Sequence, residues 1–265
     1  VPDEQKGTRG GLRALAPARG ALAGALGTLD VIVGPETRLF VVAFMVIALV
    51  LPALIFGQRQ ARAALMRPVH SREDQEDNPL RTRSVAVRMW SARFLVQIAE
   101  AGLFAFLLFW LRSIMPGVHE NTSANTFSLV LIAAVPISLW LGRWSDRAGK
   151  PMVPLVACAA LSAVGLGLMA TSQTIEWAIA SFVFFGIAAT IFLSLHTAQT
   201  LRVLPKPQHR GRDLGVFNLT NTLPSLVMPW LTLLLVPSFG FGALFARFAA
   251  LALVASGLLA TIRKS

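Results

Sequence analysis

The sequence predicts an all-α protein, a polytopic transmembrane helical bundle of about eight spans. Only 14% of the residues are charged, whereas a soluble domain has roughly 25%. The 55% that are hydrophobic fall in long runs, and a run of about 20 apolar residues crosses a bilayer as a helix. Lipid offers the backbone no hydrogen-bond partners, and uninterrupted runs exclude the alternating pattern of a barrel.

Seven of the expected spans are clear from the apolar runs alone. They cover residues 38–57, 90–111, 125–141, 152–171, 177–199, 214–236 and 240–262. An eighth span is predicted at 12–33, although it carries Arg13 and Arg19 and ends near Asp30. Its Ala and Gly residues are typical of a tightly packed transmembrane interface, which favours its inclusion.

The basic residues follow the expected topology. Most of the 24 Lys and Arg lie in alternate segments, which belong to one side of the membrane; these are 1–13, 58–89, 142–150, 200–213 and 263–265. The opposite connections hold essentially Arg38 and Arg112. The positive-inside rule therefore predicts a multi-pass protein of a bacterial-type inner (plasma) membrane with both ends cytoplasmic. The net charge of +11 is explained by topology, so no nucleic-acid partner is expected beside the lipid bilayer.

The polar, mixed-charge segment 58–89 is expected to be a cytoplasmic central loop. It separates a two-span part, 1–57, from a six-span part, 90–265. The chain begins at Val1 with neither a Met nor a signal-peptide pattern, which predicts that its true N-terminus is missing.

The segment GRWSDRAGKP resembles the signature loop of the major facilitator superfamily, Gly-x-x-x-Asp-Arg-x-Gly-basic. The matching positions are Gly142, Asp146, Arg147, Gly149 and Lys150. An approximate repeat of the glycine pattern at 7–11 and 211–215 encloses six spans, the number in each half of parallel-repeat transporters. The resemblance implies a partial fold of this superfamily, helices five to twelve, with 1–57 as the end of the first half.

The resemblance also implies a function: transport of a small-molecule substrate by alternating access, with a proton as the coupling ion. The segment RGRDLGVFNLTNTLP resembles the eleventh helix of sugar-type members, which favours a sugar or glycoside. The signature loop would act as a conformational latch, with Asp146 docked against the positive end of a helix near residues 7–11. An ordinary basic cytoplasmic turn is the alternative.

Three polar residues share one face of the predicted span 90–111. Arg93, Gln97 and Glu100 are spaced at i, i+4 and i+7, and a charge at this depth costs about 2.5 to 3.5 kcal/mol on insertion scales. Glu100 is the candidate proton site, with Arg93 as counter-charge or Gln97 as a substrate hydrogen-bond partner. The alternative is an Arg–Glu pair that joins helices.

Five further candidates for substrate or proton binding lie in other spans: His196, Gln199, Asn218, Asn221 and Arg19. The imidazole of His196 belongs to a residue type that titrates near neutral pH and could relay protons. Asn218 and Asn221 lie one turn apart and suit either a hydroxyl-rich substrate or a contact between helices. Arg19 would face an anionic substrate group or extend toward the cytoplasm.

Other classes of function find less support in the sequence. The four His are scattered and Cys158 is alone, so no metal ion, cofactor or enzymatic centre is expected. A channel would show charge rings or a filter-like loop. The alternatives that stay open are a drug or metabolite exporter of the same superfamily and a non-transporting membrane sensor.

Overall fold

The computed structural model describes residues 83–203 and 210–263, together with Ile47. The spans predicted at 12–33 and 38–57, Arg19, and most of the central loop lie outside these residues. The described part of the chain is helical and has five helices: α3 (Arg83–Ile114), α4 (Glu120–Ala148), α5 (Met152–Ala170), α6 (Ile175–Val203) and α7 (Arg210–Arg263). Each is long and apolar enough to cross a membrane.

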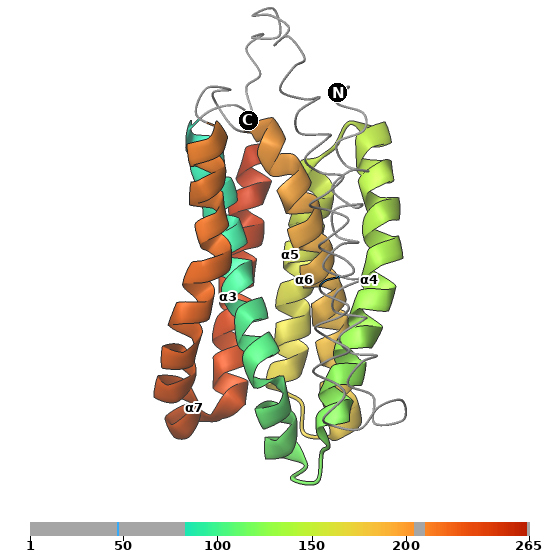
Figure 1. Ribbon diagram of the computed structural model, residues 1–265, viewed down its shortest axis with the longest axis vertical. Helices are drawn as coiled ribbons and strands as arrows, with labels where there is room; N and C mark the ends of the chain where they lie inside the picture. The colour runs from blue at the N-terminus through green and yellow to red at the C-terminus, as the bar shows by residue number, and fades with distance from the viewer. Residues whose placement is uncertain (1–46, 48–82, 204–209, 264–265) are drawn as a thin grey trace, which may run out of the picture. The chain divides into compact units, whose positions relative to one another are not determined.

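The last helix, α7, is two spans rather than one. Gly240 has φ 73° and ψ 172°, a backbone conformation that residues with a Cβ rarely adopt, and it reverses the chain between 210–239 and 241–263. Figure 1 shows the two arms side by side, orange and red. All six spans predicted between 90 and 262 therefore lie within helices, which confirms a helical transmembrane bundle in this part of the chain.

Helix α3 extends beyond its predicted span at the amino end. It begins at Arg83, inside the segment expected to be the central loop. The extension is explained by packing, since Val85 and Met89 are both buried in the core. A helix thus continues past the apolar run that hydropathy alone identifies.

Successive spans run up and down, so that alternate connections meet at the same end of the bundle (Figure 1). Helix α7 packs most extensively against α3 and α5, and α5 packs against α6. Helix α4 is more peripheral and contacts chiefly α6. Helix α3 therefore contacts both α6 and α7.

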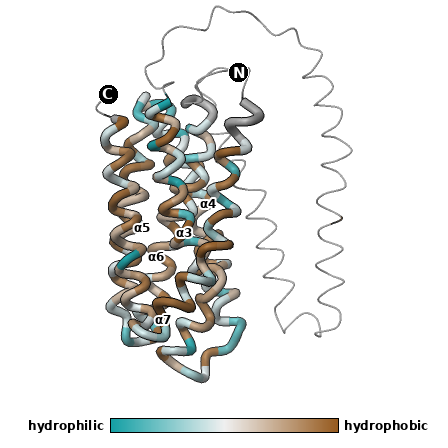
Figure 2. The backbone as a smooth tube through the Cα atoms, turned by 90° about the vertical axis from the view of Figure 1, so that its left-hand side faces the viewer, coloured by the Kyte–Doolittle hydropathy of each residue, from teal (hydrophilic) through white to brown (hydrophobic). Residues whose placement is uncertain are grey.

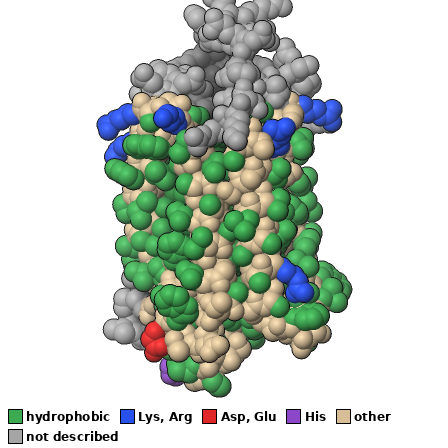
Figure 3. Space-filling view, turned by 180° about the vertical axis from the view of Figure 1, so that it is seen from behind, with side chains coloured by type: hydrophobic (Ala, Val, Ile, Leu, Met, Phe, Trp, Pro, Cys, Tyr) green, Lys and Arg blue, Asp and Glu red, His purple; other side chains and the backbone are tan. Residues whose placement is uncertain are grey.

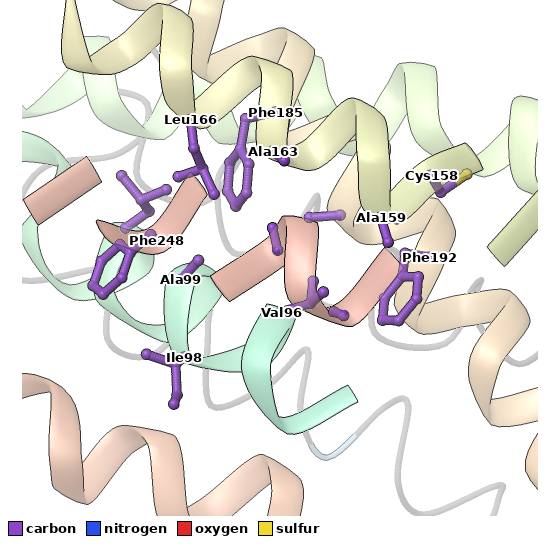
Figure 4. Packing of buried hydrophobic residues seen from close by; sticks show 14 of the residues in the cluster. Val96, Ile98, Ala99, Cys158, Ala159, Ala163, Leu166, Phe185, Phe192 and Phe248 are labelled. Atoms are coloured by element: carbon purple, nitrogen blue, oxygen red, sulfur yellow. The ribbon is translucent and has the colours of Figure 1, made fainter. Parts of the chain in front are cut away.

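The core between α3, α5, α6 and α7 combines aromatic rings with small residues (Figure 4). At Gly165 of α5, an added Cβ would lie 2.8 Å from the Cα of Phe185 in α6, so only a glycine permits this approach. The indole of Trp110 meets the ring of Phe245 edge to face, with centroids 4.8 Å apart. Small residues bring the helix backbones together, as is typical of packing within membranes.

The outer surface is that of a protein in lipid. Figure 2 shows hydrophobic colour along the helices and hydrophilic colour gathered mainly toward their ends. Figure 3 shows a largely hydrophobic face with most of its Lys and Arg at one end and a further basic patch toward the other end. The first of these ends is where α3 begins and α4 ends, and the basic residues there include Arg83, Arg88, Arg143, Arg147 and Lys150.

Candidate functional site

A cluster of polar side chains, part of it buried and part of it exposed, joins α3, α6 and α7, and Arg93 is its centre. Arg93 Nη1 donates to Thr197 Oγ1 over 2.9 Å and to the Leu193 carbonyl over 3.3 Å, both on α6. Arg93 Nη2 donates to Asn221 Oδ1 on α7 over 3.1 Å. The amide of Asn221 in turn donates to Asn218 Oδ1 over 3.0 Å. One guanidinium thus holds three helices in register.

His196 of α6 is fully buried and supports this arginine. Its Nε2 lies 2.9 Å from the Met89 carbonyl on α3, and a carbonyl only accepts, so the ring proton sits on Nε2. Nδ1 is then an acceptor, and it lies 3.5 Å from Arg93 Nη1 and 3.3 Å from Thr200 Oγ1. The hydrogen bonds therefore assign the imidazole a structural place between α6 and α3.

Gln97 and Glu100 lie near the middle of α3, where the helix is deepest in its apolar span. Gln97 Nε2 donates a hydrogen bond to Glu100 Oε2. Both side chains are half-buried, yet Gln97 Oε1 is buried and has no hydrogen-bond partner in the described part of the chain. A carboxylate and an unpaired amide oxygen therefore stand side by side, and both accept hydrogen bonds.

These two residues line a partly open cavity of about 320 Å³ between α3 and α7. Beside Gln97 and Glu100, the lining residues are Ala101, Phe104, Ala105, Ser225, Met228 and Pro229. Three of the lining residues are polar, and the other walls are apolar. On α7, Asn218, Asn221 and Ser225 recur at helical spacing, so the polar row from the arginine cluster leads to the cavity.

Arg93 and Glu100 share one face of α3, as the spacing predicts, but they do not pair. Seven residues of helix separate them by about 10 Å along the axis. The ion pair within the described helices joins Arg112 to Glu120 at 3.9 Å, and these two side chains are exposed. Each membrane-embedded charge is instead held by neutral groups, and a direct Arg–Glu contact does not form.

The signature segment is mostly helix. Gly142, Asp146 and Arg147 lie in the last turns of α4, and the turn itself begins at Gly149, with φ 62°. The Gly149 N–H donates to the Asp146 carbonyl over 3.4 Å and the Lys150 N–H to the Ser145 carbonyl over 3.3 Å. This is a Schellman cap, which explains why glycine stands at that position. The predicted partner of the loop, residues 7–11, lies outside the described residues.

Sequence reasoning found part of the site. It named Arg93, Gln97, Glu100, His196, Asn218 and Asn221, which the fold brings to neighbouring faces of α3, α6 and α7. Gln199 is buried, and its Oε1 has no partner among the described residues. Thr197, Met228 and Phe104 were not predicted from the sequence. Apolar or hydroxyl residues in an apolar span carry no signal that distinguishes a cavity wall from the core.

The bundle of apolar spans, with charged and amide side chains converging inside it, is that of a polytopic membrane protein with a membrane-embedded polar site. Residues 89–264 match the Major Facilitator Superfamily. The chain therefore belongs to this superfamily of membrane transporters. It is 26% identical over 162 residues to an uncharacterized MFS-type transporter of Mycobacterium tuberculosis (strain CDC 1551 / Oshkosh). That similarity covers 59% of this chain and 35% of the relative, about a third of its length.

Proposed function

We propose that the protein containing this chain transports a small solute across the membrane by alternating access, coupled to protons through Glu100. Membership of the superfamily supports transport. The single observation behind the coupling is the position of Glu100, a carboxyl group near the middle of an apolar helix that lines a partly open cavity. An ionised carboxylate in this place is costly, so proton binding and release there would change the free energy of the access states.

The proposed orientation places the basic end of the bundle in the cytoplasm of a bacterial-type inner membrane. The basic residues at the end where α4 meets α5 support it by the positive-inside rule. In this orientation Asp146 lies on the cytoplasmic side, where a latch would steady one access state.

Two substrate classes are proposed. A sugar or glycoside is favoured by the amides of Asn218 and Asn221 and by the resemblance of that helix to sugar-type members. However, Asn221 already accepts from Arg93 and donates to Asn218, which leaves fewer groups for hydroxyls. A drug or metabolite exporter is the second candidate, and the apolar walls of the cavity favour it.

The experiment is pH-driven transport in liposomes that carry the full-length protein. Wild type is expected to move solute against its gradient when a pH gradient is imposed, and to exchange labelled solute in its absence. Glu100→Gln is expected to lose pH-driven accumulation and to keep exchange when the solute is supplied at saturating concentration, because an amide does not bind or release a proton in this pH range. Glu176→Gln, an exposed carboxylate at the start of α6, is the matched control.

Accumulation that persists in Glu100→Gln would remove Glu100 as the coupling site. If wild type shows no exchange of any labelled sugar, drug or amine, the transport proposal itself fails and a sensor is favoured.

A further inference from the structure

We propose that the cavity between α3 and α7 binds organic amines as ammonium ions, with the charged head at Glu100 and Gln97 and the apolar body against Phe104 and Met228. The inference rests on the proposed function and specifies its substrate class. It follows from the hydrogen-bond inventory of the cavity, its apolar walls and its charge.

With Glu100 ionised, the head of the cavity presents two hydrogen-bond acceptors, the Glu100 carboxylate and Gln97 Oε1, beside the second N–H of the Gln97 amide. The Gln97 amide nitrogen faces Glu100, which fixes the orientation of the amide and leaves Oε1 as a buried, unpaired acceptor. A buried acceptor without a partner is destabilising until a donor arrives. Because the ionised carboxylate of Glu100 is acceptor-only, the ligand that satisfies both groups must bring several N–H or O–H donors.

The body of the cavity is apolar. Ala101, Phe104 and Ala105 of α3 face Met228 and Pro229 of α7. The ring of Phe104 is largely exposed and offers its π-face, which attracts cations, to a ligand. A volume of about 320 Å³ is at the small end of ligand pockets, so one ring and a short chain would fit.

Met228 is the buried part of the apolar wall, with 1% of its surface exposed. A Cβ added at Gly102 would lie 2.1 Å from Met228 Cε, so the thioether lies directly against the backbone of α3. The wall beside the polar head is therefore closely packed hydrocarbon and sulfur, which suits the apolar body of an amine.

Sugars, anions and ammonium ions are the ligand classes to compare, and the negative charge of Glu100 together with the apolar walls distinguishes them. A sugar would satisfy Glu100 and Gln97 but would place its remaining hydroxyls against hydrocarbon, where an unpaired polar group is costly. An anion would be repelled by Glu100. The nearest cation on α3, Arg93, is about 10 Å away along the axis and is engaged by Asn221 and α6. An ammonium ion donates hydrogen bonds to both acceptors and is attracted by the negative charge of Glu100. Its apolar body places no unpaired polar group against the hydrocarbon walls.

The test is equilibrium binding to the purified full-length protein, measured by calorimetry with matched probes. Phenethylamine supplies charge and N–H donors, its N-trimethyl derivative keeps the charge without donors, and 2-phenylethanol keeps only the ring and one hydroxyl. Phenethylamine is expected to bind at least about tenfold more tightly than 2-phenylethanol and than methyl glucoside. The N-trimethyl derivative is expected to bind more weakly than phenethylamine, because it has no N–H group to donate a hydrogen bond to Gln97 Oε1.

Variants connect the preference to the two acceptors. Glu100→Gln is expected to bring phenethylamine and 2-phenylethanol within about twofold of each other, whereas Glu176→Gln keeps the wild-type ratio. Gln97→Met, close in size and without an acceptor oxygen, is expected to erase the advantage of phenethylamine over its N-trimethyl derivative. This second variant keeps the test decisive if Glu100→Gln does not fold.

Equal affinity of the alcohol or the glucoside, or an unchanged ratio in Glu100→Gln, would overturn the amine proposal. If amines fail to bind while another solute is accumulated under a pH gradient, this inference falls and the proposed transport stands. If amines bind as expected and no solute is moved, the amine inference stands and the proposed transport falls.

Discussion

Arg93 Nη2 on α3 donates a 3.1 Å hydrogen bond to Asn221 Oδ1 on α7, across 128 positions of sequence. The same guanidinium reaches α6 through Thr197, so one cation ties together three helices around the cavity. Removing a charge from water is tolerable here because each contact is to a neutral acceptor with a partial negative charge. The arginine is therefore a positioning residue for the faces that line the site.

Asn221→Ala is predicted to destabilise the bundle by about 1.5 to 3 kcal/mol, because it removes an acceptor from a charged donor. The measurement is unfolding of the purified protein in detergent, followed by helical circular dichroism against denaturant. Asn218→Ala is the matched control: within the described part of the chain Asn218 accepts from the neutral amide of Asn221, and its loss is expected to cost about 0.5 to 1.5 kcal/mol. Equal costs for the two variants would contradict the assignment.

Two glycines of α5 are predicted to respond to alanine with opposite signs. A Cβ at Gly165 would meet the Cα and Cβ of Phe185 at 2.8 Å, and backbone does not move aside, so overpacking costs about 1 to 3 kcal/mol. At Gly167 a Cβ meets nothing within 4 Å, so Gly167→Ala gains about 0.5 to 1 kcal/mol from helix propensity. Thermal unfolding of both variants in the same detergent tests this. A stable Gly165→Ala would show that α5 and α6 do not approach as closely as described.

The sequence predicted the spans and one polar face, and the reason is physical. Hydropathy identifies what crosses lipid, and the spacing of Arg93, Gln97 and Glu100 fixes that they share a face of one helix. Which residue of α6 or α7 that face meets depends on how each helix is rotated and how deep it sits, and no local pattern encodes this. Thr197 and Met228 were missed for that reason. The opposite charges of Arg93 and Glu100 suggest an ion pair from the sequence. In the structure, however, Arg93 donates to neutral acceptors on neighbouring helices.

Asp146→Asn tests the latch. The Asp146 carboxylate lies in the last turn of α4, at the negative end of the helix dipole. A latch predicts that exchange transport in liposomes falls at least about fivefold in Asp146→Asn, while circular dichroism shows that the helical bundle remains folded. Glu120→Gln, at the other end of α4, is the control and is expected to transport normally. Unchanged exchange in Asp146→Asn would leave the segment as an ordinary capped turn.

Cysteine labelling in intact cells tests the orientation of the bundle. Lys150 and Gly117 are both exposed and lie in turns at opposite ends of α4, and the native Cys158 is buried with 4% exposure, so it provides a silent background. A membrane-impermeant maleimide is expected to label Gly117→Cys from outside and to reach Lys150→Cys only after the membrane is opened. The basic residues near Lys150 require this if the positive-inside rule governs insertion. Labelling of Lys150→Cys in sealed cells would reverse the orientation and would place Asp146 on the outer side, where a cytoplasmic latch has no meaning.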